Sequence, residues 1–309
     1  MIDEIRALLT RHLPGREVRS ITKLGEGLDN VAYEVDHEPI TPGSPVALGS
    51  LIAGGSLIAG GSLIVRGSKE ADPAARAEAI RREAELLAVV ARLSPLPVPE
   101  PVFADMDAGF LAYVRLPGVP LISHPVAEPA RLAAPLGGFL SSLHQAPVAE
   151  MEKLAPHDSF PLASWRDDAE RDYRKIVPHV PTAARPLVED FLGRTPPAEP
   201  PAGAFCHNDL GGEHLLVDVR ASTITGVIDW TDAAITDPAC DLALIYRDLG
   251  PEIFDLTLSH YGARFDDADR ERATFYARCS LLEDLAYGLT TGASLYTHSA
   301  LAHLTRTFR

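Results

Sequence analysis

The chain has 309 residues, enough for two lobes with a hydrophobic core each, and its 46% hydrophobic content is typical of a soluble globular protein. Its 43 acidic residues exceed its 28 lysines and arginines, and the formal charge of −15 disfavours nucleic acid and anionic membranes as partners. This charge favours a cationic small molecule as a ligand, unless it serves only to keep the protein soluble.

The N-terminus and the cysteines indicate the compartment. Residues 1–6 are amphipathic and acidic, and they lack the basic head and apolar run of a signal peptide. The three cysteines, Cys206, Cys240 and Cys279, are scattered and show no metal-ligand spacing. We therefore expect a cytoplasmic protein, and we expect it to be a monomer.

The first predicted element is a hairpin of strands 21–24 and 31–35, joined by a turn that contains Gly25 and Gly27. The two glycines let the backbone approach phosphate groups closely and offer amide donors to them. A Gly-x-Gly hairpin on its own is equally consistent with a plain turn.

An uncharged repeat follows the hairpin. The hexapeptide Gly49-Ser50-Leu51-Ile52-Ala53-Gly54 recurs at residues 55–60 and, with a different end, at residues 61–66. Length alone would suggest a membrane helix over residues 46–65. The glycine pairs within it suit hairpin turns between short strands better, so we predict a tandem duplication around one strand and no membrane span.

The remaining elements of the first half are a strand ending at Arg66 and a helix that begins near Asp72, an N-cap ahead of Pro73. A strand over residues 110–114 then runs out into a Pro-Gly loop. Beyond it, hydrophobic periodicity predicts mostly helices, at residues 130–145, 165–176, 183–192, 240–249, 253–261, 268–287 and 300–308.

The most informative segment runs from Phe205 to Trp230. Asp209 lies on a short loop after an apolar stretch, His214 follows five residues later, and a predicted hairpin of two strands ends at Asp229. Such a hairpin can bring two carboxylates and an imidazole around one ion. Phosphoryl transfer needs a carboxylate that orients and deprotonates the acceptor hydroxyl, and ligands that hold Mg²⁺ against the nucleotide phosphates. The segment therefore predicts a kinase.

This constellation resembles the aminoglycoside phosphotransferase family, whose catalytic loop reads His-x-Asp followed five residues later by Asn or His, with a metal-binding Asp in Ile-Asp-Trp or Ile-Asp-Phe. The resemblance extends from Ile21 to Phe308. It implies an α+β, bilobal protein-kinase-like fold. A small N-terminal antiparallel β-sheet lobe with a helix would span residues 1–112, a linker 113–121, and a larger, mostly helical C-terminal lobe 122–309.

The resemblance also implies the roles in the catalytic centre. Asp209 would be the catalytic base, Asp229 the principal Mg²⁺ ligand and His214 the second ligand. The histidine departs from the usual asparagine. This departure matters because imidazole suits transition metals better than Mg²⁺. It is found in the branches that act on the 2″-hydroxyl of aminoglycosides and on macrolides.

For the nucleotide, the resemblance implies a phosphoryl donor, GTP or ATP, covered by Gly25 and Gly27. It places Arg66 on the phosphates, paired with Glu83, with Lys69 as the alternative to Arg66. Tyr113 would be the gatekeeper, and the backbone of Val114 to Leu116 would bind the purine edge. Because Tyr113 is large, we predict that GTP is used at least as well as ATP.

For the acceptor, the chain looks closest to the aminoglycoside 2″-phosphotransferases, with the macrolide 2′-phosphotransferases as the alternative and a nucleotide-binding pseudoenzyme as a third reading. Aminoglycosides are polycations, so carboxylates are expected to line the acceptor cleft. Arg247 stands where the 2″ branch tends to place an acidic residue, and a cation there would repel an ammonium group. Asp241 is expected to anchor the catalytic loop. The carboxylates placed in the cleft are Asp232, Asp237, Asp248, Glu252, Glu283 and Asp284.

Overall fold

The computed structural model describes residues 1–27, 30–37 and 62–309. The predicted tandem duplication, apart from residues 62–66 of its last copy, therefore lies outside the described residues. The contacts divide the chain into two compact units, residues 1–92 with 97–116, and residues 93–96 with 117–309.

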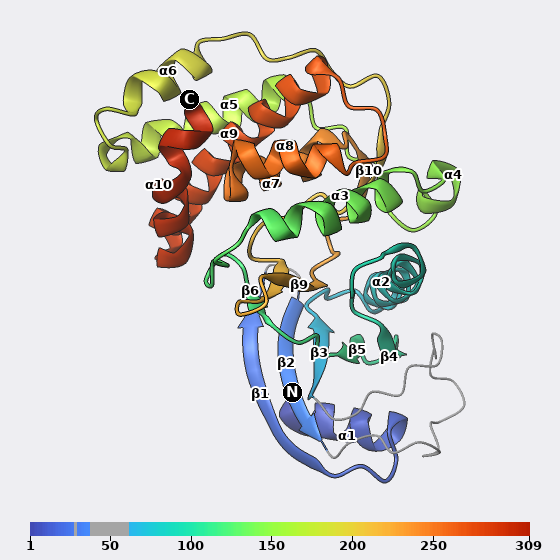
Figure 1. Ribbon diagram of the computed structural model, residues 1–309. Coiled ribbons are helices and arrows are strands. Elements are labelled where there is room, and N and C mark those ends of the chain that lie inside the picture. The colour runs from blue at the N-terminus through green and yellow to red at the C-terminus, as the bar shows by residue number, and fades with distance from the viewer. Residues whose placement is uncertain (28–29, 38–61) are drawn as a thin grey trace. The chain divides into compact units, whose positions relative to one another are not determined.

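The first unit is built on a five-stranded antiparallel sheet with the strand order β1-β2-β3-β5-β4 (Figure 1). The burial of β2 alternates along the strand, which is the pattern of a strand with one face on a core. Helix α1 supplies Ile5 and Leu8 to that core, where they join Val35, Val65 and Phe103. The strands are β1 (Val18–Glu26), β2 (Asn30–His37), β3 (Ser62–Ser68), β4 (Pro101–Asp105) and β5 (Phe110–Val114), and the helices are α1 (Ile2–His12) and α2 (Pro73–Leu93).

Helix α2 begins as the sequence predicts. The Asp72 carboxylate accepts a hydrogen bond of 2.8 Å from the backbone N–H of Ala75, which is an N-cap interaction. Pro73 occupies the first helical position, where its missing N–H leaves no hydrogen bond unmade.

The second unit is mostly helical (Figure 1). The long helix α9 lies among its neighbours, packed against α5, α7 and α10. Two small sheets accompany the helices, one of β6, β8 and β9 and one of β7 and β10. The strands are β6 (Val119–Pro120), β7 (Ala204–Cys206), β8 (Leu215–Asp218), β9 (Thr223–Val227) and β10 (Ala234–Thr236). The helices are α3 (Ala130–His144), α4 (Val148–Met151), α5 (Leu162–Ile176), a 3₁₀ turn (Val177–His179), α6 (Arg185–Leu192), α7 (Ala239–Leu249), α8 (Pro251–Ser259), α9 (Asp267–Thr291) and α10 (Ser294–Phe308).

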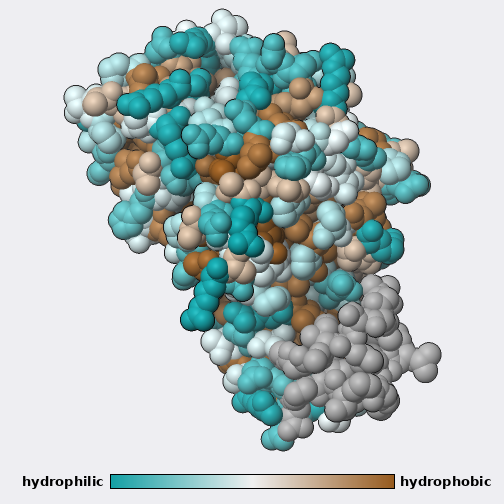
Figure 2. Space-filling model, viewed as in Figure 1, coloured by the Kyte–Doolittle hydropathy of each residue, from teal (hydrophilic) through white to brown (hydrophobic). Residues whose placement is uncertain are grey.

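The surface agrees with the composition. On the face shown in Figure 2, hydrophilic side chains lie over the helices of the second unit, with smaller apolar patches among them. Within the described ranges, no helix has the length and apolar character needed to cross a membrane.

Candidate active site

The two ends of the Phe205–Trp230 segment meet in the core of the second unit. Trp230 is buried, its ring stacks on that of Phe205 at a centroid distance of 6.4 Å, and Phe139 packs edge-on against it at 6.1 Å. The indole N–H of Trp230 donates to the carbonyl of Val227, the last residue of β9. Phe205 precedes the loop that carries Asp209, and Trp230 follows Asp229. Their packing therefore holds both carboxylates in the second unit.

Asp241, in the first turn of α7, holds the start of the predicted catalytic loop, residues 207–214. Its two carboxylate oxygens accept hydrogen bonds from the backbone N–H groups of His207 (3.0 Å) and Asn208 (2.7 Å). Burial would raise the pKa of Asp241, but hydrogen bonding to His144 and these backbone donors keep it below its usual value. His144 in turn lies 2.7 Å from the Tyr261 hydroxyl. Asp241 therefore anchors the loop as expected.

His207 ties the catalytic loop to the end of β9. Its Nδ1 accepts a hydrogen bond of 3.3 Å from the N–H of Asp209, so Nε2 carries the proton and donates to the carbonyl of Ile228 at 3.0 Å. Burial lowers the pKa of His207 to about 4, which keeps the imidazole neutral. The role of His207 is not predicted from the sequence; its place before Asp209 in the motif is the signal that could have suggested one.

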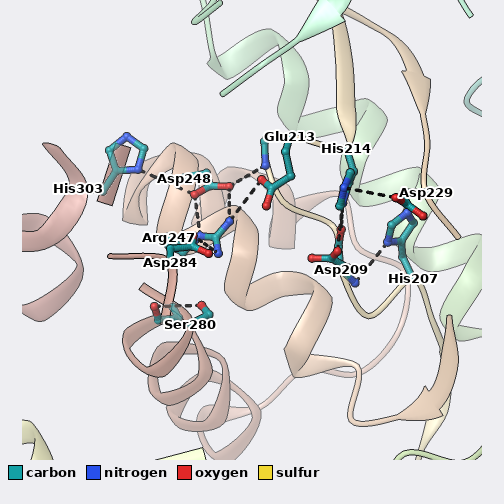
Figure 3. A network of polar contacts seen from close by, with 12 residues as sticks. His207, Asp209, Glu213, His214, Asp229, Arg247, Asp248, Ser280, Asp284 and His303 are labelled. Carbon is teal, nitrogen blue, oxygen red and sulfur yellow. Dashed lines mark hydrogen bonds and ion pairs between the residues drawn. The ribbon is translucent and has the colours of Figure 1, made fainter. Parts of the chain in front are cut away.

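His214 lies between the two predicted functional carboxylates (Figure 3). Its Nδ1 is 2.8 Å from the carbonyl oxygen of Asp209 and 3.2 Å from Oδ2 of the same residue. Its Nε2 is 3.9 Å from Oδ2 of Asp229. Asp229 has a left-handed backbone with φ of 60°, a conformation that costs roughly 1–3 kcal/mol and clusters at functional sites. The structure thus brings Asp209, His214 and Asp229 together.

The electrostatics of the site follow from its burial. Desolvation raises the pKa of Asp209 to about 6, with the charges of Glu213 and Asp232 adding to the rise and that of His214 opposing it. Burial lowers the pKa of His214, but the carboxylates of Asp209 and Asp229 outweigh this and raise it above its usual value. At neutral pH the carboxylate of Asp209 is therefore mostly ionised, and its side chain is half-buried.

The donor set fits a divalent cation. Ligand atoms of Asp209, Glu213 and His214 all lie within 4.8 Å of one another. Because the Nδ1–H of His214 donates to a carbonyl, the lone pair of Nε2 is left on the side of Asp229. A second group of possible ligands, His144, Cys206 and Asp241, is buried, and His144 and Asp241 are already engaged in the hydrogen bonds that hold the loop.

Arg247, on α7, is enclosed by carboxylates instead of facing an acceptor (Figure 3). It is 4% exposed and makes ion pairs with Asp248 (2.8 Å), Asp284 (2.7 Å) and Glu213 (3.6 Å). We call these four residues the Arg247 cluster. Asp248 and Asp284 thus lie near the loop that carries Asp209, with a protein cation already between them. That they line an acceptor cleft stays a prediction.

The other predicted acceptor residues lie in different surroundings. Asp232 is exposed and close enough to Asp209 to affect its pKa, and Glu283 is exposed on α9 next to Asp284. Glu252 is exposed in the first turn of α8, and among the described residues no ion pair or hydrogen bond joins it to the catalytic loop.

Asp237 requires a correction. Its side chain is buried at 2% exposure and accepts a hydrogen bond of 2.6 Å from Nε of Arg272. A carboxylate enclosed in this way has no access to an acceptor, so the expectation that Asp237 lines the acceptor cleft is wrong. Its role is to pair with Arg272 at the start of α7, where it also accepts from the N–H of Ala239.

A mostly apolar pocket of about 390 Å³ adjoins the catalytic loop at Gly212. Its polar side is formed by Asp248, His298, Ser299, His303 and Arg306. Burial and the charge of Arg306 lower the pKa of His303 to about 4. The apolar part of the lining consists of Leu121, Ile122, Pro125, Val126, Pro129, Leu249, Leu295 and Ala302.

The predicted nucleotide residues lie in or beside the first unit. Nη1 of Arg66 donates to Glu83 at 2.7 Å, and both side chains are largely buried. Lys69, the alternative to Arg66, instead pairs with Glu26 at 2.6 Å and donates to the carbonyl of Gly27. Gly25 lies near the end of β1, where it pairs with Ala32 of β2. Tyr113 and Val114 are the last residues of β5, and Leu116 follows them.

Comparison with known proteins identifies the family. The model of the phosphotransferase enzyme family, APH, matches residues 56–276. Viomycin phosphotransferase of Streptomyces vinaceus is 27% identical over 188 residues, which cover 59% of this chain and 65% of that protein, so the match spans less than two thirds of the relative's length.

Two solved structures resemble the whole chain. A GDP and kanamycin complex of an APH(2″) enzyme has a TM-score of 0.65 at 19% identity, covering 98% of this chain and 97% of that one. The macrolide 2′-phosphotransferase MphH from Brachybacterium faecium has a TM-score of 0.62 at 23% identity, covering 98% of both chains. These likenesses confirm the predicted kinase-like α+β fold. Because the family model matches residues 56–276, which is more than half of this chain, the chain belongs to the phosphotransferase enzyme family.

Proposed function

We propose that this protein is an antibiotic phosphotransferase, which transfers the γ-phosphate of GTP or ATP to a hydroxyl of an aminoglycoside, with the 2″-hydroxyl as the expected position. The observation that carries the proposal is the grouping of Asp209, His214 and Asp229. Phosphoryl transfer requires little more of a protein than a positioned carboxylate and metal ligands.

Asp209 is the proposed catalytic base. Its pKa of about 6 leaves it mostly ionised at neutral pH, and its partly exposed side chain can accept a hydrogen bond from an acceptor hydroxyl. The loop that carries it is held by hydrogen bonds from its backbone to the Asp241 carboxylate and to the His207 ring. These contacts fix the direction of the carboxylate before an acceptor binds.

Nucleotide and metal binding are assigned on the same basis. His214 and Asp229 would hold Mg²⁺, which when bound neutralises charge on the nucleotide phosphates. Arg66, oriented by Glu83, would contact the phosphates together with the turn of Gly25 and Gly27. We assign nucleotide binding to the lobe of residues 1–112 and to the linker 113–121, where Tyr113, Val114 and Leu116 would contact the base.

The acceptor is proposed to be cationic because acidic side chains gather around Asp209. Asp232 and Glu213 raise the pKa of Asp209, and the exposed Glu283 extends the acidic surface onto α9, where its neighbour Asp284 is paired with Arg247. The solved relative bound to GDP and kanamycin supports this choice of acceptor.

A macrolide is the second candidate acceptor, and one observation favours it. The pocket beside Gly212 is lined largely by apolar side chains, which suits an apolar molecule better than a polycation. The likeness to a macrolide 2′-phosphotransferase supports the same alternative.

A transfer assay separates these candidates. The protein would be incubated with γ-labelled GTP or ATP and Mg²⁺, and with a panel of aminoglycosides and macrolides, and labelled product would be counted. We expect label on at least one aminoglycoside. Label on macrolides alone would move the assignment to the second candidate, and nucleotide binding without any transfer would indicate a pseudoenzyme.

A further inference from the structure

The Arg247 cluster joins three separate elements through one buried guanidinium (Figure 3). Glu213 comes from the catalytic loop, Asp248 from α7 beside Arg247, and Asp284 from α9. Buried carboxylates without a counter-ion are strongly unfavourable. Arg247 is therefore the group that allows these three side chains to lie together.

The catalytic loop is attached to this cluster at two successive residues. The N–H of Gly212 donates a hydrogen bond of 2.7 Å to Oδ2 of Asp248, whose two oxygens accept from the Arg247 guanidinium at 2.8 and 3.0 Å. Oε2 of Glu213 is buried, lies 3.6 Å from Nη2 of Arg247, and has no hydrogen-bond partner in the part of the chain that the structure describes. The guanidinium charge is thus what Glu213 faces.

Gly211 leaves the space that the contact between Glu213 and Arg247 needs. A Cβ at this position would overlap the Glu213 carboxylate and would lie 2.8 Å from Nη2 of Arg247. The absence of a side chain lets the loop lie directly over the ion pair. Residues 211, 212 and 213, which follow Asp209, all therefore depend on where the Arg247 side chain lies.

The opposite side of the cluster is fixed as well. Arg306, on α10, donates to the backbone carbonyls of Arg247, at 3.0 Å, and of Asp248. The end of α7 is thereby held between α10 and the catalytic loop. The backbone that carries the Arg247 side chain is therefore fixed on this side.

We propose that Arg247 is a positioning residue for the catalytic loop: its guanidinium, through Asp248 and Glu213, sets the position of the loop that carries Asp209 relative to α7 and α9. The inference rests on the proposed phosphoryl transfer, because it concerns the placement of its base. Arg247 itself would touch neither nucleotide nor acceptor.

The test is chemical rescue. Arg247→Ala leaves a space that free guanidinium can occupy. We expect kcat of the variant to fall by roughly 10²-fold, the size of effect that a shift of about 1 Å in a reacting group produces, while KM for the nucleotide changes much less. Millimolar guanidinium should restore much of kcat, and urea at the same concentration should not. Arg174→Ala, which removes an exposed arginine of α5 paired with Glu170, is the matched control and should show neither effect.

Two further variants keep the proposal testable if Arg247→Ala does not fold. Arg247→Lys keeps the charge but lacks the planar fork that reaches three carboxylates, so kcat should fall by less than in Arg247→Ala. Gly211→Ala keeps all four charges but displaces Glu213 or Arg247, so kcat should fall without any response to guanidinium. Wild-type kcat in Arg247→Ala, or a loss in a folded variant that guanidinium does not restore, would overturn the proposal. If only Gly211→Ala folds, wild-type kcat in that variant would do the same. An inactive wild type would count against the proposed function instead.

Discussion

At the scale of single residues, Asp284 shows how crowding sets a proton affinity. Burial raises its pKa to about 7, and Glu213, Asp248 and Glu283 add to the rise, while Arg247 opposes it. One guanidinium cannot neutralise three carboxylates at once, so one of them accepts a proton near neutral pH.

This shift predicts how stability depends on pH. In the unfolded chain the Asp284 pKa returns to about 3.9, so the folded state binds this proton more tightly. Its contribution to stability is fully present below about pH 4 and is lost as the pH rises toward 7, with a slope of up to about 1.4 kcal/mol per pH unit. Asp284→Asn should lack this part of the slope in urea unfolding measured from pH 4 to pH 8. Asp255→Asn, at an exposed carboxylate of α8, is the control; equal slopes in wild type and Asp284→Asn would contradict the prediction.

Individual residues were predictable from the sequence where a motif fixed their spacing. The grouping of Asp209, His214 and Asp229 follows from one hairpin, and the structure has it. The surroundings of Asp237 and Arg247 were not predictable, because their partners Arg272 and Asp284 are distant in sequence and on another helix. The sequence shows that a carboxylate is present but not whether it already forms an ion pair with an arginine of the protein.

At the scale of elements, the small sheet of β6, β8 and β9 positions the two proposed metal ligands, because β8 begins right after His214 and Asp229 follows β9. Gly118 directly precedes β6 and has a φ of 104°. A Cβ there would overlap the Thr225 hydroxyl and lie 2.9 Å from the carbonyl of Val217. Only glycine fits this position.

Gly118→Ala should therefore destabilise the protein by at least about 1–3 kcal/mol, the cost of a residue held in a sparsely populated backbone region, with the overlap adding to it. Gly138→Ala is the matched control. Gly138 lies within α3 with open space at its Cβ position, so alanine there should be neutral or stabilise by up to about 1 kcal/mol. Both changes would be measured by urea unfolding, and a Gly118→Ala variant as stable as Gly138→Ala would be inconsistent with this geometry.

Long periodic elements were predicted better than short ones. Helix α9 was expected at residues 268–287, and the structure extends it to Asp267–Thr291, between a capping box at Asp266 and a left-handed Gly292. Helix α10 begins at Ser294 instead of residue 300, because one short turn separates it from α9. The short strands β6, β7 and β10 were not predicted, since two or three residues carry no periodicity.

At the scale of the whole molecule, the formal charge of −15 and the acidic residues near Asp209 act in the same direction on a cationic acceptor. Adding salt shortens the Debye length from about 10 Å at 0.1 M to about 3 Å at 1 M. An acceptor attracted by these charges should therefore bind more weakly at high salt.

We predict that KM for an aminoglycoside rises markedly with added salt, and that Glu283→Gln both raises KM and reduces its salt dependence. Initial rates at several salt concentrations test this, with a macrolide as the comparison, since apolar contacts respond little to screening. A KM that is indifferent to both salt and Glu283→Gln would argue for the apolar pocket as the acceptor site.

The general fold was predictable because the Phe205–Trp230 motif resembles one family, and the family match and the solved structures agree with it. The choice of acceptor was not predictable to the same degree. It depends on which carboxylates remain open to a ligand and on the apolar pocket, and both are products of packing between helices far apart in the sequence.

The most direct test of the central claim is the rate of phosphoryl transfer to an aminoglycoside by wild type and by Asp209→Asn. The account predicts transfer by the wild type and a kcat lower by roughly 10²- to 10⁴-fold in the variant, the usual contribution of a general base. Nucleotide affinity should stay nearly unchanged, because Asp209 is not a proposed ligand of the nucleotide. Near-wild-type turnover by Asp209→Asn, or a wild type that phosphorylates no aminoglycoside, would contradict it.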